Sequence, residues 1–192
     1  MRQTTIERNT KETAIKLLLN LDGGAVKVDT GIGFFDHMLT ALFFYAGFGA
    51  LLTVRGDLQV DGHHTVEDTG IAVGQAIKEA CGDKKGIVRF AHKYVPMDEA
   101  LCFTALDFSG RAFLHFDAPM PQERIGNYDS CLTEEFMRAL AFNAGITLHQ
   151  RCEYGVNAHH ITEALFKSLG LAMKEALRVE GERVVSTKGV LV

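Results

Sequence analysis

The two halves of this chain repeat each other. Residues 62–81 (GHHTVEDTGIAVGQAIKEAC) align with residues 158–177 (AHHITEALFKSLGLAMKEAL) at an offset of 96, half of the 192-residue length. Eight of the twenty aligned positions are identical, where composition alone would give about one or two. A duplication this long predicts that the chain folds as two similar units.

A second pair of segments extends the repeat upstream. Residues 35–48 (FDHMLTALFFYAGF) align with residues 133–146 (TEEFMRALAFNAGI) at an offset of 98, so a two-residue indel separates the two blocks. Both segments have helical apolar spacing. Both also contain a glycine near the end, Gly47 and Gly145, and glycine is the residue type that most often ends a helix. We therefore expect a helix in each segment.

Strand-like runs surround these predicted helices. Runs at 50–54 and 146–152 follow them, and runs at 14–21, 25–29, 100–107 and 112–116 precede them. Asp22-Gly23-Gly24 and Ser109-Gly110 separate the preceding runs and predict hairpins. Each half is thus β-β-α-β-α. We expect an α+β fold, a single domain of two tandem repeats at about 1–84 and 85–192, related by a pseudo-twofold axis, with two helices on one face of each sheet.

The composition indicates a globular domain with a sizeable core. Apolar residues make up 47% and charged residues 23% of the chain, and the net charge of -4 includes no large basic block. This argues against a nonspecific grip on nucleic acid. The polar N-terminus and short apolar runs predict a cytoplasmic protein without membrane contact. The four separated cysteines predict reduced, buried thiols rather than disulfides or a zinc ribbon.

Both copies of the repeat contain the motif His-His-x-x-Glu at the start of a predicted helix. The copies are His63-His64-Thr65-Val66-Glu67 and His159-His160-Ile161-Thr162-Glu163. On a helix the glutamate shares a face with one histidine, whereas adjacent histidines diverge by about 100°. Adjacent histidines should therefore serve different ions, which predicts two related metal sites, each drawing ligands from both copies. Imidazole and carboxylate ligands suit Mn, Fe or Zn.

His37 is a further ligand candidate, because it lies on the first predicted helix. Its counterpart in the second half is Glu135, which also suits a cation. The alternative for Glu135 is a solvated helix glutamate, and the alternative for a lone His-His pair is a surface or helix-capping role. The duplication favours the metal interpretation. His92, His115 and His149 have no duplicated context and are expected to be core or surface residues.

Several motifs together resemble the imidazoleglycerol-phosphate dehydratase family over nearly the whole chain. They are ERNTKET at 7–13, GIGFFDHML at 31–39, DGHHTVED at 61–68, SGR at 109–111, NAHHITEA at 157–164 and STKGVL at 186–191. The resemblance implies a ribosomal protein S5 domain 2-like fold. It implies a hydro-lyase that converts imidazole glycerol phosphate to imidazole acetol phosphate in histidine biosynthesis. It also implies two Mn²⁺ per active site and twenty-four subunits built from trimers, with active sites completed between subunits.

The resemblance assigns roles to particular residues. The implied metal ligands are His37, His63, His64, Glu67, His159, His160 and Glu163. The eighth ligand position falls on Glu135, where some family members have histidine. The implied substrate contacts are Glu12, His37, His63, Arg89, Arg111, Ser186 and Lys188. The three cations suit a phosphate monoester, although without the resemblance each would be taken as a surface cation. The C-terminal segment is expected to close over the substrate.

The implied reaction suggests a mechanism. We hypothesise that two metal ions hold the substrate ring as an imidazolate, whose electrons expel hydroxide. Glu12 is the acid/base candidate, because it is the motif carboxylate not assigned to metal, and Glu67 and Glu163 are the other catalytic carboxylates. The alternative for Glu12 is an exposed strand glutamate. Competing interpretations of the whole chain are a carboxylate-bridged redox protein and a nonenzymatic module that uses metal only for assembly.

Overall fold

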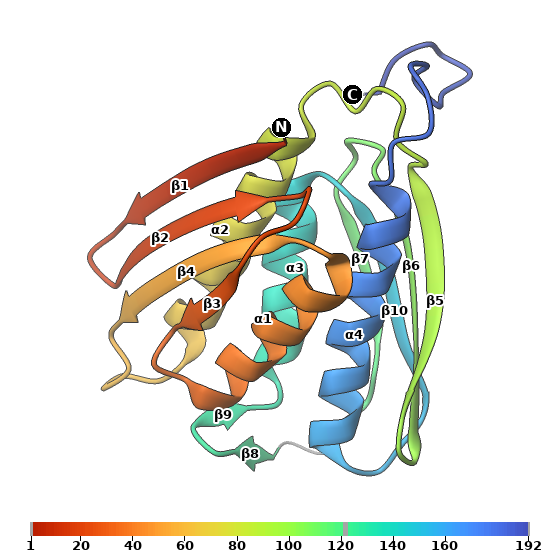
Figure 1. The fold of residues 1–192 in the computed structure, drawn as a ribbon. Coiled ribbons are helices and arrows are strands. Elements are labelled where there is room, and N and C mark those ends of the chain that lie inside the picture. The colour runs from red at the N-terminus through yellow and green to blue at the C-terminus, as the bar shows by residue number, and fades with distance from the viewer. Residues whose placement is uncertain (1, 121–122, 192) are drawn as a thin grey trace.

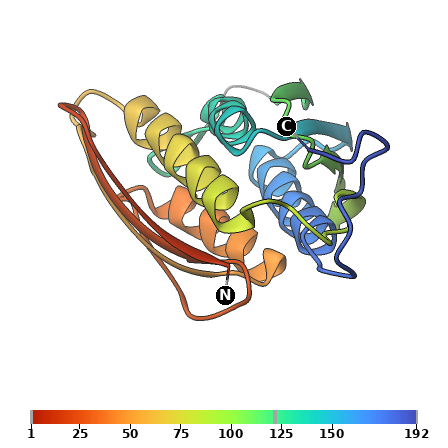
Figure 2. The same ribbon diagram turned by 90° about the horizontal axis from the view of Figure 1, so that it is seen from above.

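Four helices lie between two four-stranded sheets in the computed structural model, which describes residues 2–120 and 123–191 (Figures 1 and 2). The first half forms β1 (Gln3–Asn9), β2 (Thr13–Asn20), β3 (Val26–Asp29), α1 (Gly33–Ala46), β4 (Gly49–Gly56) and α2 (His63–Cys81). The second half forms β5 (Phe90–Met97), β6 (Ala100–Asp107), β7 (Phe113–Asp117), β8 (Arg124–Ile125), β9 (Tyr128–Asp129), α3 (Leu132–Ala144), β10 (Thr147–Tyr154) and α4 (Ala158–Ala176).

The two halves have the same topology. The strand orders are β1-β2-β4-β3 and β5-β6-β10-β7, and in each sheet the last strand of the order pairs in parallel with its neighbour. The helices α1 and α2 cover the first sheet, and α3 and α4 cover the second. Between the sheets, α1 packs on α4 and α2 packs on α3. Exchanging the halves turns one of these helix pairs into the other, so the α+β fold with two related repeats is confirmed.

Aromatic side chains join the two halves in one core. Phe136 of α3 lies with its ring centroid 5.4 Å from Phe35 of α1 and 5.2 Å from Phe166 of α4. All three rings are fully buried. Burial of each such side chain is worth about 1.5–3 kcal/mol, so this cluster holds both repeats together.

The predicted hairpins at Asp22-Gly23-Gly24 and Ser109-Gly110 are wrong. In each half a later strand lies between the two runs, since β4 separates β2 from β3 and β10 separates β6 from β7. The chain at Gly23 and Gly24 instead crosses over Gly49, where an added Cβ would lie 2.7 Å from the Gly23 carbonyl oxygen. The two glycines have φ of 111° and 141°. They serve this close crossing rather than a tight turn.

Each four-stranded sheet contains one strand more than expected, and the second half also has the short paired strands β8 and β9. The sequence signal for β1 is weak because this edge strand is polar and buries only Ile6. The edge strand β5 contains Pro96 and an exposed face, which hid its alternation. The true hairpins therefore join β1 to β2 and β5 to β6. The turns of these two hairpins reach the histidine motifs.

The helix boundaries agree with the sequence. Gly47 and Gly145 end α1 and α3 in the left-handed conformation, with φ of 73° and 67°. Both His-His-x-x-Glu motifs begin helices, α2 at His63 and α4 at Ala158. None of the helices in the described ranges combines the length and apolar character that crossing a membrane requires.

All four cysteines are free thiols, as expected, but they are not all buried. Cys81 and Cys102 are buried, Cys152 is partly buried and Cys131 is exposed. Burial raises the pKa of the Cys81 thiol to about 12, so this residue is inert packing.

The helix crossings predict a stability effect at Gly170. A Cβ at this position of α4 would lie 2.7 Å from the Leu42 carbonyl oxygen of α1. We expect Gly170→Ala to lower the free energy of unfolding by about 1–3 kcal/mol, because α1 and α4 must separate. Gly33→Ala is the control, since nothing lies within 4 Å of that Cβ position. Urea unfolding at fixed protein concentration measures both, and equal stability of the two variants would contradict the close packing.

Candidate active site

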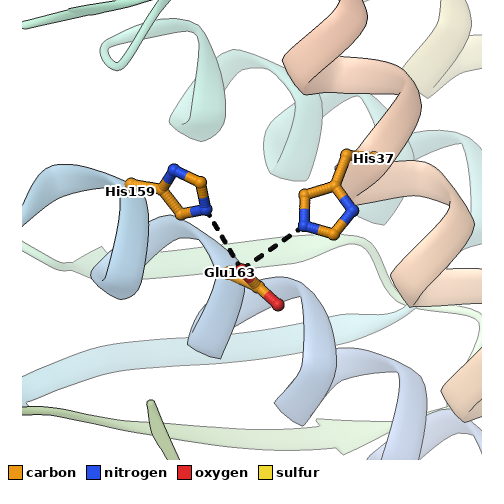
Figure 3. A group of neighbouring side chains, drawn as sticks. All are labelled: His37, His159 and Glu163. Atoms are coloured by element: carbon orange, nitrogen blue, oxygen red, sulfur yellow. Dashed lines mark hydrogen bonds and ion pairs between the residues drawn. The ribbon is translucent and has the colours of Figure 1, made fainter. Parts of the chain in front are cut away.

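His37, His159 and Glu163 form a compact cluster at the N-terminal ends of α1 and α4 (Figure 3). The Glu163 Oε2 lies 3.2 Å from Nε2 of His159 and 3.5 Å from Nε2 of His37. One ligand atom from each residue falls within 4.8 Å of the others, the spacing of a set that shares one ion. Within residues 2–120 and 123–191 this is the one His, Cys, Asp or Glu group of three with such spacing.

Glu163 is the buried member of this cluster, with a side chain 8% exposed. Burial opposes its ionisation, but the hydrogen bond and charge of Lys167, 2.7 Å away, and the nearby histidines outweigh this effect. The net result is a Glu163 pKa below the usual value. The carboxylate is therefore held ionised in a partly dry setting, which favours cation binding.

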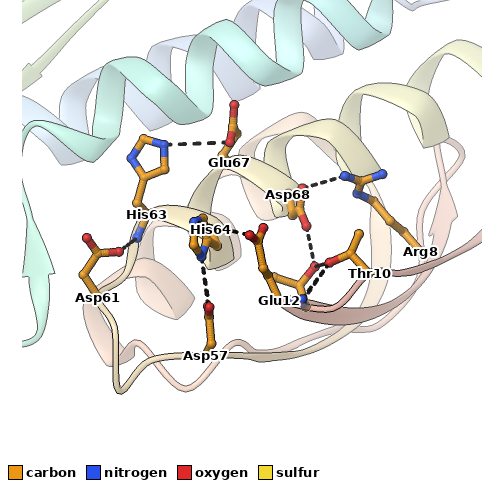
Figure 4. A network of polar contacts seen from close by, with 10 residues as sticks. Arg8, Thr10, Glu12, Asp57, Asp61, His63, His64, Glu67 and Asp68 are labelled. Carbon is orange, nitrogen blue, oxygen red and sulfur yellow. Dashed lines mark hydrogen bonds and ion pairs between the residues drawn. The ribbon is translucent and has the colours of Figure 1, made fainter.

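The first-half motif is arranged around α2 (Figure 4). The Nε2 of His63 lies 3.8 Å from a Glu67 oxygen, four residues along the helix. His64 turns away from this pair, toward Asp57 and Glu12. Its Nδ1 lies 3.0 Å from Asp57 Oδ2, and its Nε2 lies 3.8 Å from Glu12 Oε1. The hydrogen bond with Asp57 raises the pKa of His64.

The second-half motif shows the same divergence. His159 faces His37 and Glu163, whereas His160 faces the β5–β6 turn. The His160 Nδ1 lies 2.6 Å from Glu99 Oε2, and its Nε2 lies 3.6 Å from Asp98. The hydrogen bond between His160 and Glu99 raises the pKa of His160 and lowers the pKa of Glu99 to about 2. In both copies the glutamate joins the first histidine, and the second histidine points elsewhere, as the helical spacing predicts.

The sequence reasoning missed Asp57, Glu99 and Lys167. Asp57 follows β4 directly, and Glu99 lies in the turn between β5 and β6. Lys167 was detectable, because it lies four residues after Glu163 on the same helix. Glu99 was not, because only the strand order brings its turn to the start of α4.

Glu135 stands apart from the other ligand candidates. Under the repeat, Glu135, His63 and Glu67 correspond to His37, His159 and Glu163, yet the structure does not draw the first three into one cluster. The charged neighbour of Glu135 is Arg138, with Nε 3.9 Å away. Its role as a ligand stays a prediction.

Four of the predicted substrate contacts line one cavity of about 680 Å³. They are Arg89, Arg111, Ser186 and Lys188. Arg89 is 11% exposed and donates to both oxygens of Asp107 and to the Val185 carbonyl. It thus holds the C-terminal segment in place. Arg111 is 62% exposed and lies 3.9 Å from the same aspartate, so its guanidinium is far more accessible to a ligand.

The cavity lies far from the histidine motifs of the same chain. The Arg89 N–H bonds to the Ala176 carbonyl at the C-terminal end of α4, while His159 and His160 begin this helix. His159 and Ala176 are 17 residues apart on α4, and a rise of 1.5 Å per residue separates them by roughly 25 Å. The histidine motifs lie at the lower end of Figure 1 and the C-terminal segment at the upper end.

Three other histidines lie outside both clusters. His92, His115 and His149 are exposed on the outer face of the second sheet, where the rings of His115 and His149 are 5.6 Å apart. They are surface residues, one of the two settings expected for them.

Comparison with known proteins decides the family. The model of the imidazoleglycerol-phosphate dehydratase family matches residues 30–173. The chain belongs to the imidazoleglycerol-phosphate dehydratase family. It is 52% identical to the imidazoleglycerol-phosphate dehydratase of a Thermoanaerobacter species over the full length of both chains.

Solved structures of imidazoleglycerol-phosphate dehydratases have the same fold. That from Staphylococcus aureus is 37% identical with a TM-score of 0.83, covering 93% of this chain and 99% of that one. That from Pyrococcus furiosus is 38% identical with a TM-score of 0.84, covering 97% and 100%. These two enzymes thus share the α+β architecture of this chain, in which two similar mixed sheets are packed with helices.

The residues present fit a divalent transition metal. The cluster offers two imidazole nitrogens and one ionised carboxylate, a donor set that suits Mn, Fe or Zn. His64 and His160 each have one ring nitrogen occupied by a carboxylate, which is the usual arrangement behind a metal-binding histidine.

The cluster predicts the effect of removing one histidine. We expect His159→Ala to weaken Mn²⁺ binding by at least about tenfold, because it removes one of three neighbouring ligand atoms. His149→Ala, on the outer face of the second sheet, is the matched control and should bind like the wild type. Titration of the metal-free proteins, with free Mn²⁺ followed by electron paramagnetic resonance, gives the affinities. Equal affinity of the two variants would exclude His159 as a ligand.

Proposed function

We propose that this protein dehydrates imidazole glycerol phosphate to imidazole acetol phosphate, the hydro-lyase reaction of histidine biosynthesis. The full-length identity of 52% to an imidazoleglycerol-phosphate dehydratase carries this proposal. The paired histidine motifs and the cationic cavity support it, because the substrate has an imidazole ring at one end and a phosphate at the other. A cytoplasmic location fits the four free thiols.

Two Mn²⁺ per active site are the proposed cofactor. The residues that would hold them are His37, His63, His64, Glu67, Glu135, His159, His160 and Glu163. Bound there, the ions would supply Lewis-acid polarisation of the imidazole ring and fix its orientation. The compact His37, His159 and Glu163 cluster is the support within one chain.

The phosphate is proposed to bind in the cavity at the other end of the molecule. Arg111 and Lys188 would donate charge-assisted hydrogen bonds to the phosphate, and the Ser186 hydroxyl would donate a further hydrogen bond. Arg89 would act mainly by holding the segment that contains Ser186 and Lys188, since Asp107 and the Val185 carbonyl occupy its donors. The C-terminal segment forms one wall of the cavity, and Arg89 holds it there. The proposed closure over the substrate is provided by this wall.

Glu12 is the proposed acid/base residue. The reaction removes hydroxide from the carbon beside the ring and a proton from the next carbon, and the enol that remains becomes the ketone. Glu12 is 53% exposed and lies 3.8 Å from His64 Nε2, at the edge of the proposed metal site. It can therefore take a proton from carbon or return one. Glu67 lies beside His63, and Glu163 lies beside His159. These two glutamates would contribute to catalysis by holding the metal ions.

We further propose that each active site is shared between chains. A substrate of three carbons, a ring and a phosphate cannot reach across the roughly 25 Å between cavity and motifs of one chain. The second sheet supports assembly, because its outer face exposes Phe90, Tyr94 and Phe113, each at least half exposed. A homo-oligomer of twenty-four subunits built from trimers, with intersubunit sites, is the assembly proposed, without nucleic acid or membrane as a partner.

The activity itself gives the first test. Purified protein with Mn²⁺ should form the ketone from imidazole glycerol phosphate, and chelation should stop it. We expect Glu12→Gln to lower kcat by about 10²–10⁴-fold with unchanged Mn²⁺ content. Glu7→Gln on β1, whose carboxylate pairs with surface Lys16, is the control. Unchanged turnover of Glu12→Gln would remove this residue from the mechanism, and activity that survives chelation would remove the metals.

Mixed oligomers test the shared site. Arg111→Ala and Glu12→Gln should each be nearly inactive alone. If cavity and motifs of one site come from different chains, oligomers reassembled from equal amounts regain roughly a quarter of the sites. A mixture of Arg111→Ala and Lys188→Ala is the control and should stay inactive, because both residues belong to one cavity. No recovery in the first mixture would show that each site is built from one chain.

A further inference from the structure

Glu12 and Glu99 occupy the same position in the two repeats. Glu12 directly precedes β2, and Glu99 directly precedes β6. The strand registers agree, since Asn20 at the end of β2 pairs with the first residue of β4, and Asp107 at the end of β6 pairs with the first residue of β10. Both glutamates approach the second histidine of the motif in their own half.

The two glutamates nevertheless contact different ring nitrogens. Glu12 faces Nε2 of His64 at 3.8 Å, and Asp57 holds the Nδ1 of this ring at 3.0 Å. In the second half, Glu99 itself holds Nδ1 of His160 at 2.6 Å. Glu99 therefore occupies the place that Asp57 has in the first repeat, not the place of Glu12.

The backbone explains this exchange. A bulge between Cys152 and Tyr154 adds one residue to β10, whereas β4 pairs with β2 without a bulge, so Gly155 corresponds to Gly56. The packing agrees, because a Cβ at Gly56 would meet Thr65 and Thr13, and a Cβ at Gly155 would meet their repeat counterparts Ile161 and Ala100. The place of Asp57 then falls on Val156, which has no carboxylate, so the carboxylate that holds the second histidine comes from another segment.

Glu99 is fixed firmly enough to do this. Its Oε1 accepts the backbone N–H groups of Asn157 at 2.9 Å and Val156 at 3.3 Å, while Oε2 contacts the ring. The Asn157 side chain in turn accepts the N–H groups of His159 and His160 as the N-cap of α4. The carboxylate thus ties the β5–β6 turn to the ring and to the start of its helix.

We propose that Glu99 is a positioning residue that orients the His160 ring through Nδ1 and leaves Nε2, which faces the exposed Asp98 at 3.6 Å, for the metal ion. Its repeat counterpart Glu12 keeps the acid/base role. This inference rests on the proposed function, in which His160 is a metal ligand. A carboxylate on Nδ1 fixes the tautomer with the lone pair on Nε2 and makes this nitrogen a stronger donor.

The test compares Glu99→Gln with the wild type by Mn²⁺ titration and kinetics. Glutamine keeps the size and the acceptor for the two backbone N–H groups but loses the charge. We expect Mn²⁺ affinity to fall by about 10–100-fold and kcat to recover to near the wild-type value at saturating Mn²⁺. Asp57→Asn should behave alike through His64. Glu153→Gln, whose partner is Arg151 on the sheet surface, is the control without effect.

The outcomes are distinguishable. Unchanged affinity in a folded Glu99→Gln variant overturns the positioning role, as does lower thermal stability with unchanged affinity, which would indicate a merely structural contact. Low kcat at saturating Mn²⁺ also overturns it, because it would make Glu99 an acid/base residue like Glu12. A wild-type protein that binds no Mn²⁺ refutes the proposed metal function itself.

Discussion

The close packing of α1 against α4 is the contact on which the candidate site depends. Gly170 lets the backbones approach so closely that an added Cβ would lie 2.7 Å from the Leu42 oxygen. This approach brings His37, from the first repeat, to 3.5 Å from Glu163 in the second. The repeat supplies the same contact again, because Gly74 of α2 lies equally close to α3. The glycine common to both repeats, Gly74 or Gly170, thus has a packing reason that also positions the candidate ligands.

The divergence of the two histidines of each motif follows from helix geometry alone. The first histidine and the glutamate share a face, so His63 meets Glu67 and His159 meets Glu163. The second histidine points about 100° away, toward carboxylates outside its helix. The repeat and the motif are visible in the sequence, and helix geometry then predicts which side chains of the motif lie together. The starts of α2 and α4 could be predicted in the same way.

Features set by strand order could not be predicted in this way. The apolar periodicity locates β2, β3, β6 and β7 but does not show which of them are neighbours, so in the sequence the glycines after β2 resemble a hairpin turn. The same gap hid Glu99, whose contact with His160 spans 61 positions and depends on β5 and β6 forming the hairpin. The difference between His37 and Glu135 illustrates a further limit, because equivalent positions with equally suitable ligand types end in different surroundings.

The duplicated motif is proposed to hold a pair of metal ions at the helix N-termini. Anomalous diffraction at the manganese absorption edge, from crystals of the Mn²⁺-loaded protein, tests it most directly. We predict two strong peaks per chain, one of them beside His37, His159 and Glu163. The rings of His64 and His160 should each direct Nε2 at an ion. Peaks absent from the helix N-termini, with His63 and His160 facing solvent, would contradict it.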